Sequence, residues 1–114
     1  MHEIGIMSSA MTAVLAEAER HGAVRVDRIV LRVGALSGAE PDALRFAFDA
    51  VSAGTPAAGA ALDIVTVPAR ARCGDCGVEF DAGPGFITEC PQCRRFCGDI
   101  LQGRELELAR VEMS

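Results

Sequence analysis

Apolar residues recur at helical spacing through the first part of the chain. Gly22 follows this stretch, at a position where a residue in the left-handed conformation commonly ends a helix. The spacing therefore predicts an amphipathic helix from Glu3 to His21. The apolar positions at this spacing are Ile4, Met7, Met11, Val14, Leu15 and Ala18.

A stretch rich in β-branched residues follows, from Val24 to Leu36. Within it, Ile29, Leu31 and Val33 occupy every second position. Side chains at alternate positions of an extended chain lie on the same side. The pattern predicts a strand with one buried face.

A second helix is predicted after this strand. Ser37 and Glu40 have the spacing of a capping box, and Pro41 is tolerated in the first turn of a helix. Gly54 is placed to end the helix. The apolar stripe between them consists of Leu44, Ala47, Phe48 and Val51.

Four cysteines form two C-x-x-C pairs, Cys73 with Cys76 and Cys90 with Cys93. Two such turns direct four thiolates toward one point, which is the environment of a structural zinc ion with Zn–S bonds of about 2.3 Å. A rubredoxin-type iron site is the main alternative, because the same sulfur tetrahedron suits iron. Disulfides are disfavoured, because five cysteines cannot pair completely and no secretory signal is evident. Cys97 is predicted to be a free thiol, with competition for the zinc as the alternative.

Two further strands complete the predicted fold. Residues 62–67 are rich in β-branched residues, and residues 104–112 alternate between apolar and polar. A terminal strand this amphipathic needs partners, so we expect it to pair with the strands before the cysteine-rich segment. The prediction is an α+β fold in which two helices lie on a three-stranded sheet, with an inserted zinc-ribbon module. The two domains would be an α+β domain of residues 1–68 plus 104–114 and the zinc ribbon at 69–103.

Length and composition predict a compact globular chain, since half of the 114 residues are hydrophobic. No apolar run reaches the length of a membrane span, and the N-terminus lacks the layout of a signal peptide. These patterns predict a cytoplasmic protein that does not associate with membranes.

The charge pattern argues against nucleic acid as a partner. The formal net charge is −5, and residues 69–103 contain four arginines and five acidic residues. Four thiolates around a divalent cation would bring this module to about −3. A module that follows a phosphate backbone needs the opposite sign, and the absence of Trp and Tyr leaves few platforms for stacking bases.

The first residues offer a second kind of metal site. The α-amine of Met1 can form adjacent chelate rings on one metal ion with the amide and imidazole nitrogens of His2. A nitrogen-rich, square-planar site suits Ni(II) or Cu(II) better than tetrahedral zinc. The fourth ligand could be the amide nitrogen of Glu3, or a carboxylate from Glu3 or Glu40. The alternative is a solvated terminus, with Glu3 at the positive end of a helix and Glu40 in its capping box. His21 is predicted at a helix C-terminus without a ligand role.

The sequence contains no arrangement typical of catalysis. It has no Ser/His/Asp constellation and no glycine-rich phosphate loop. We therefore predict a protein that binds metal and is not an enzyme.

Taken in order, these features resemble the HypA family of hydrogenase maturation factors along essentially the whole chain. The resemblance implies a nickel metallochaperone with a nickel site at the N-terminus involving His2. It also implies a structural zinc site at the four paired cysteines. Glu40 is added as a nickel ligand because an acid near this position lies close to nickel in some relatives. The segments that carry the resemblance are residues 1–3, 28–34, Ser37, residues 44–48, the cysteine pairs and residues 103–106.

The resemblance also implies partners. Nickel would pass into the precursor of the large subunit of nickel–iron hydrogenase, in cooperation with a GTPase of the HypB family, and in some organisms urease maturation proteins are served as well. Residues 94–97 depart from the family pattern, which commonly has small polar residues there. Two other classes stay open: a zinc-ribbon protein–protein adaptor with an inert His2, and a rubredoxin-like electron carrier.

Overall fold

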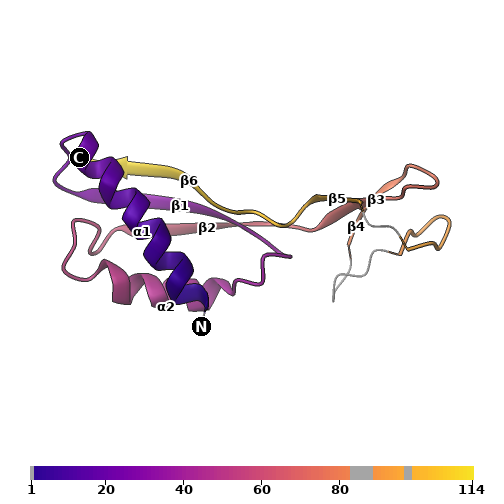
Figure 1. Cartoon of the computed structure of the whole chain (residues 1–114), viewed down its shortest axis with the longest axis horizontal. Helices are drawn as coiled ribbons and strands as arrows, with labels where there is room; N and C mark the ends of the chain where they lie inside the picture. The colour runs from indigo at the N-terminus through magenta and orange to yellow at the C-terminus, as the bar shows by residue number, and fades with distance from the viewer. Residues whose placement is uncertain (1, 83–88, 97–98) are drawn as a thin grey trace. The chain divides into compact units, whose positions relative to one another are not determined.

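The structure is a computed structural model, and it describes residues 2–82, 89–96 and 99–114 (Figure 1). The chain divides into two compact units, which are described separately below. The helical unit comprises Met1–Arg32, Ala39–Val65 and Glu107–Ser114. The cysteine unit comprises Val33–Gly38 and Thr66–Leu106. No helix in the described part of the chain is long and apolar enough to cross a membrane.

The first helix, α1 (His2–Arg20), confirms the periodicity of the apolar residues. It ends in a Schellman motif, in which Gly22 at φ 66° lets the amide of Ala23 donate to the carbonyl of Ala18. The buried residues of the helix are Glu3, Met7, Met11, Val14 and Ala18. Glu3 is the exception in this list, since it is the one buried side chain that carries a charge.

The second helix, α2 (Pro41–Ser52), begins differently from the prediction. Its N-cap is Glu40, whose carboxylate accepts a 3.4 Å hydrogen bond from the amide of Asp42. The capping box starting at Ser37 was therefore wrong, and the Ser37 amide instead donates to Gly34 in a turn. The reason lies in Pro41, because a proline at the first helical position forces the residue before it into the extended region.

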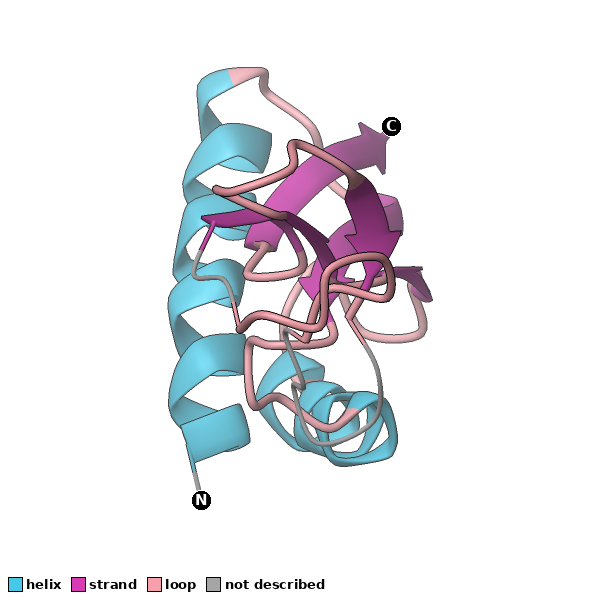
Figure 2. Ribbon diagram, turned by 90° about the vertical axis from the view of Figure 1, so that its right-hand side faces the viewer, coloured by secondary structure: helices cyan, strands magenta, loops and turns pink. Residues whose placement is uncertain are grey.

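The two helices meet near the beginning of α1, where its first turn lies beside α2 (Figures 1 and 2). The side chains that α2 buries are Leu44, Ala47, Phe48 and Ser52. The two helices pack against each other, and these residues and the buried face of α1 are parts of the buried core.

A three-stranded sheet joins β2 (Ala61–Val67), β1 (Val26–Gly34) and β6 (Leu106–Met113), in the order β2-β1-β6. The terminal strand therefore pairs with a strand that precedes the cysteine-rich segment, as predicted. On the central strand Ile29, Leu31 and Val33 are all buried, which confirms the predicted inner face.

The cysteine unit contains three short strands, β3 (Arg70–Arg72), β4 (Glu79–Asp81) and β5 (Asp99–Gln102), in the order β4-β3-β5. Both neighbours are antiparallel to β3, with Ala71 opposite Phe80 on one side and Ile100 on the other. The buried cluster is small and consists of Ala71, Cys73, Phe80 and Cys90. The predicted turn at Gly83–Gly85 lies outside the described residues. Together these elements confirm the α+β class with an inserted cysteine-rich module.

Candidate metal centres

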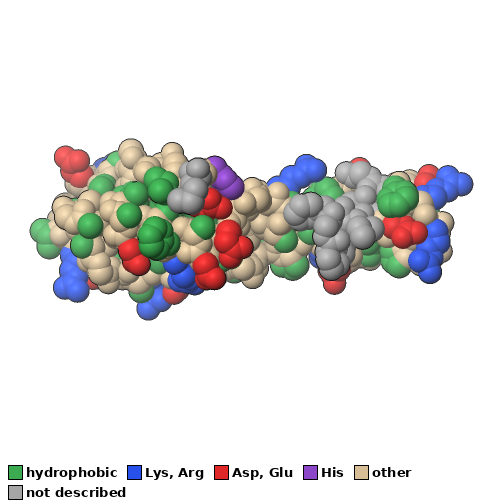
Figure 3. Space-filling model, turned by 90° about the horizontal axis from the view of Figure 1, so that it is seen from below, with side chains coloured by type: hydrophobic (Ala, Val, Ile, Leu, Met, Phe, Trp, Pro, Cys, Tyr) green, Lys and Arg blue, Asp and Glu red, His purple; other side chains and the backbone are tan. Residues whose placement is uncertain are grey.

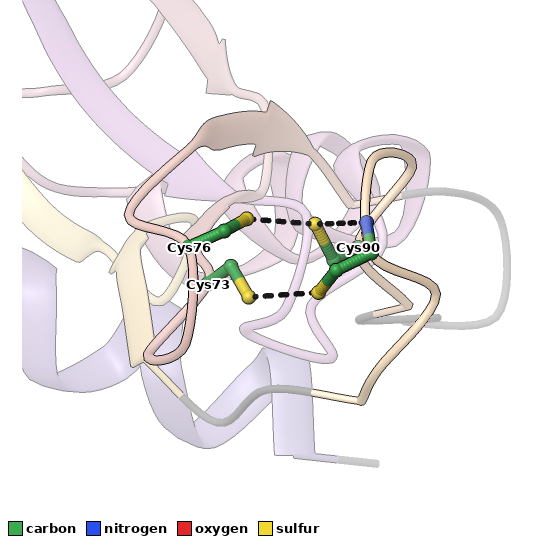
Figure 4. A group of neighbouring side chains, drawn as sticks. Cys73, Cys76 and Cys90 are labelled. Atoms are coloured by element: carbon green, nitrogen blue, oxygen red, sulfur yellow. Dashed lines mark hydrogen bonds between the residues drawn. The ribbon is translucent and has the colours of Figure 1, made fainter.

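The four paired cysteines converge on one point in the cysteine unit (Figure 4). All four sulfur atoms lie within 4.8 Å of one another. The Sγ atoms of Cys73 and Cys93 are 3.5 Å apart, as are those of Cys76 and Cys90. A tetrahedral ion with Zn–S bonds of about 2.3 Å needs sulfur separations of about 3.8 Å. The donor set therefore fits a tetrahedral thiolate-bound metal, and these separations are too long for disulfide bonds.

Matching backbone hydrogen bonds build the two halves of this site. In the first, the amide of Cys73 donates to Val78 and the amide of Gly77 donates to Cys73, both at 2.9 Å. The second repeats the pattern at the same spacing: Cys90 donates to Arg95 at 2.8 Å, and Arg94 donates to Cys90 at 2.9 Å. We call these two turns the first and the second knuckle.

The residue after each knuckle adopts a left-handed backbone. In the first knuckle this residue is Gly77, with φ 75°, and in the second it is Arg94, with φ 66°. Among the described residues, Arg94 is the one non-glycine with positive φ. This conformation costs an L-residue about 1–2 kcal/mol, so the backbone of the second knuckle is strained at Arg94.

The first cysteine of each knuckle is buried, Cys73 at 1% and Cys90 at 0% exposure. The amides of Cys76 and Asp75 donate to the Cys73 sulfur and lower the pKa of its thiol to about 6. The Val78 amide favours the thiolate of Cys76, but its part-buried sulfur and the neighbouring thiols raise its pKa to about 12. The four thiols therefore cannot all ionise together unless a cation lies between them.

A second cluster lies at the start of α1. Glu3 is 8% exposed, and its Oε2 accepts a 3.2 Å hydrogen bond from the amide of Glu40. The amide of Glu3 itself and the amide of Glu40 lower the pKa of the Glu3 carboxyl. The Nε2 of His2 lies 3.6 Å from the same carboxylate oxygen, and the His2 side chain is 58% exposed. On the face shown in Figure 3, a histidine side chain lies next to acidic side chains.

The structure thus brings His2, Glu3 and Glu40 together, while Met1 and Cys97 lie outside the described residues. Within the described ranges, the four cysteines are the one group of three or more His, Cys, Asp or Glu side chains with converging ligand atoms. At the start of α1, by contrast, the side chains do not provide three converging ligand atoms. The backbone amides of the first helical turn have no carbonyl partners within the helix, and that of Glu3 bonds its own carboxylate.

The link between Glu3 and Glu40 was missed by the sequence analysis, which treated the two acids as separate candidates. No sequence pattern connects residues 37 positions apart in different helices. His21, at the other end of α1, pairs with Glu17 at 2.9 Å and lies apart from this cluster.

Comparison with known proteins places the chain in one family. Residues 1–113 match the family model described as "Hydrogenase/urease nickel incorporation, metallochaperone, hypA". The hydrogenase maturation factor HypA of Chloroflexus aurantiacus is 43% identical over 112 residues, covering 98% of both chains. The corresponding protein of a Picosynechococcus species is 42% identical over 113 residues, covering 99% of both.

Solved structures agree with this assignment. The solution structure of the Ni metallochaperone HypA from Helicobacter pylori aligns with 99% of this chain and 97% of that one, at 27% identity and a TM-score of 0.67. A second solution structure of a HypA protein gives a TM-score of 0.73 at the same identity, covering 100% of this chain and 97% of that one. The chain belongs to the HypA family of metallochaperones, which incorporate nickel during hydrogenase and urease maturation.

Proposed function

We propose that this protein binds Ni(II) at the start of α1 and delivers it to the precursor of the large subunit of nickel–iron hydrogenase. The observation that carries the proposal is the hydrogen bond from the Glu40 amide to the buried Glu3 carboxylate, beside an exposed His2. This bond holds the first turn of α1 against the N-cap of α2. A site that must both bind and release a metal ion needs a rigid backbone support and a metal ligand that a partner protein can reach.

The proposed nickel ligands are the imidazole and amide nitrogens of His2, the α-amine of Met1, and a fourth donor from Glu3 or Glu40. Nitrogen ligands in a plane favour Ni(II) and match zinc poorly. The amides of the first helical turn have no carbonyl partners within the helix, so a metal ion can use the His2 amide without breaking it, whereas the Glu3 amide already bonds its own carboxylate. The carboxylate of Glu3, already bonded to the Glu40 amide, acts best as a support that orients the first turn.

The second metal is proposed to be Zn²⁺, held by Cys73, Cys76, Cys90 and Cys93. Four thiolates leave no open coordination position, so this ion would be structural. Comparable zinc sites contribute about 10–16 kcal/mol of binding free energy to folding. On this reading, residues 69–103 form the zinc-ribbon domain, and residues 1–68 with 104–114 form the nickel-binding domain.

Nickel would be released when ligands of the partner protein replace the ligands that this chain provides. The His2 side chain is more than half exposed, so an incoming ligand can replace it without opening the core. We propose a GTPase of the HypB family and the hydrogenase precursor as partners, with urease maturation proteins as further candidates. The protein would act in the cytoplasm, where thiols stay reduced, as a carrier and not as an enzyme.

Nickel titration of the untagged, zinc-loaded protein tests the proposal, with zinc per chain counted in each sample. We expect about one nickel per chain in the wild type, and loss of this site in His2→Ala with zinc unchanged. His21→Ala is the matched control, because His21 directly follows the far end of the same helix with 59% side-chain exposure against 58% for His2. Nickel binding equal in all three proteins would refute the N-terminal site.

One observation favours a second candidate function, that of a zinc-ribbon protein–protein adaptor. Phe96, on the cysteine unit, is 76% exposed, and aromatic side chains are enriched in protein–protein interfaces. A protein that captures the hydrogenase precursor equally well with and without His2, and that binds no nickel, would be such an adaptor. A red protein with thiolate-to-iron absorption after aerobic purification would instead indicate the rubredoxin-type site.

A further inference from the structure

Three consecutive residues at the second knuckle, Arg94, Arg95 and Phe96, are all exposed. The side chain of Arg95 is 71% exposed, and Phe96 is 76% exposed. Neither the proposed nickel site nor the cysteine cluster uses these side chains as ligands. We call the three residues the arginine–phenylalanine surface.

The backbone holds this surface in place on the cysteine unit. Within the knuckle, the amide of Arg94 donates to Cys90 at 2.9 Å, and the amide of Cys90 donates to Arg95 at 2.8 Å. Phe96 then forms an antiparallel bridge with Glu89. A partner that binds here therefore has to order little of the backbone, which reduces the entropy cost of association.

Arg94 occupies a position where glycine would be less strained. Its backbone is left-handed, with φ 66°, whereas the first knuckle has Gly77 at the matching position. Strained backbone positions in non-glycine residues cluster at functional sites and ligand clamps. The strain therefore points to a role for the arginine side chain. One alternative role is to offset the negative charge of a thiolate-bound metal ion, and the experiment below separates the two.

The guanidinium groups of this unit differ in their partners. On the sheet, Arg70 pairs with Asp81 at 2.5 Å. Within the ranges that the structure describes, no hydrogen bond or ion pair reaches the guanidinium of Arg94. Arg95 pairs with Asp75 at 3.5 Å, but both side chains are more than half exposed, and such surface pairs contribute little to stability. Incoming carboxylates can therefore bind both guanidinium groups without breaking a contact that the fold needs.

The chemistry of the surface favours an acidic polypeptide as its occupant. Guanidinium groups bind carboxylates through two parallel hydrogen bonds, and arginine and aromatic side chains are both enriched in protein–protein interfaces. Two acids border the surface, Asp75 beside Arg95 and Glu89 beside Phe96. A nucleic acid or an anionic membrane carries phosphates over a wider area and would bring them against these acids. A short segment with two carboxylates avoids this repulsion.

We propose that the arginine–phenylalanine surface binds a short acidic segment of a partner protein. Two carboxylates of the segment pair with Arg94 and Arg95, and an apolar side chain between them packs on Phe96. The surface contains none of the proposed nickel ligands. The proposal therefore goes beyond nickel binding, and it applies to a nickel carrier and to an adaptor alike.

Nuclear magnetic resonance titration of the untagged, zinc-loaded, nickel-free protein tests the proposal. The probe is the hexapeptide Glu-Glu-Phe-Glu-Leu-Glu with blocked ends, added to about 5 mM. We expect amide shifts concentrated at residues 94–96, a Kd of about 1 mM or tighter, and weaker binding as salt is raised. The same peptide with Gln in place of Glu should bind at least about threefold more weakly, because it cannot form charged pairs.

Arg94→Gly separates recognition of the peptide from support of the metal site. It should bind the peptide at least about threefold more weakly, while it holds zinc at least as tightly as the wild type because the backbone strain is relieved. Phe96→Ser should also weaken peptide binding, since the apolar contact is lost. Arg72→Gln is the matched control, because it removes the same charge from an arginine of this unit that already pairs with Glu79 at 3.4 Å.

Several results would overturn the proposal. One is an acidic peptide that shifts no resonance of residues 94–96. Another is a glutamine peptide that binds as tightly as the acidic one, or an Arg94→Gly variant that binds the peptide like the wild type. Arg94→Gly protein that loses zinc would assign the arginine to the metal site instead. Tighter binding to phosphatidylglycerol vesicles or to single-stranded DNA than to the peptide would assign the surface to a membrane or to nucleic acid.

Discussion

The buried carboxylate of Glu3 accepts a hydrogen bond from the backbone amide of Glu40, 37 residues further along the chain. Glu40 is at the same time the N-cap of α2. One hydrogen bond thus joins the first turn of α1 to the N-cap of α2. Because both residues border the proposed nickel site, this contact determines how firmly the site is held.

Replacing Glu3 with Gln should weaken nickel binding. The amide side chain keeps the volume but loses the negative charge that makes the bond to the Glu40 amide strong. Mutation of a residue that supports a metal ligand typically lowers metal affinity about 10–100-fold, and we expect a decrease in this range. Isothermal titration with nickel measures it. Glu19→Gln, an exposed acid on the same helix, should bind nickel like the wild type, and an equal decrease in both variants would contradict the specific role of Glu3.

The end of α1 should show a pH-dependent contribution to stability. Hydrogen bonds from Arg20 and His21 lower the pKa of Glu17 in the folded protein. Stability from such a group is present above its unfolded pKa of about 4.3 and is lost as the pH falls through the lower folded value. Glu17→Gln should therefore be less stable than the wild type at pH 6, and the difference should vanish at strongly acidic pH. Urea unfolding at both pH values checks this, and a difference that persists in acid would contradict it.

Removing one buried cysteine should abolish binding of the structural metal. Cys73→Ser replaces a thiolate with a hydroxyl that does not ionise, so three sulfur ligands remain. We expect zinc to fall from about one per chain to a small fraction. Elemental analysis after dialysis against a mild chelator measures it. Cys97→Ser should retain its zinc, since both knuckles stay complete, and loss of zinc in this control would show that Cys97 is also a ligand.

Replacing Arg94 with Gly should strengthen the metal site. Arg94 holds a left-handed backbone at φ 66°, where Gly77 stands in the first knuckle. Relief of this strain, less the greater freedom of glycine in the unfolded chain, should yield about 0.5–1 kcal/mol, or about two- to fivefold in zinc affinity. Competition with a chelator measures the change. Arg95→Gly removes the same charge without relieving a strained backbone, so an equal gain there would assign the effect to charge.

Much of the fold follows from short-range patterns. The period of Met7, Met11 and Val14 predicted α1, and the alternation of Ile29 and Leu31 predicted the inner face of β1, because these periods repeat the geometry of helix and strand. The prediction of a capping box at Ser37 was wrong, although Ser37 and Glu40 have the required spacing. The restriction that Pro41 places on the residue before it decided where α2 begins.

The sequence by itself determined which cysteines converge, because C-x-x-C spacing folds each pair into one turn and leaves little freedom in how the thiols point. It also determined the helices and the strand faces, which depend on neighbours within a few residues. Only the tertiary structure decided that Glu3 supports the amide of Glu40 and that β6 forms an exposed edge beside β1. Such contacts join residues far apart in the chain, and their partners are selected by the packing of whole elements rather than by any local pattern.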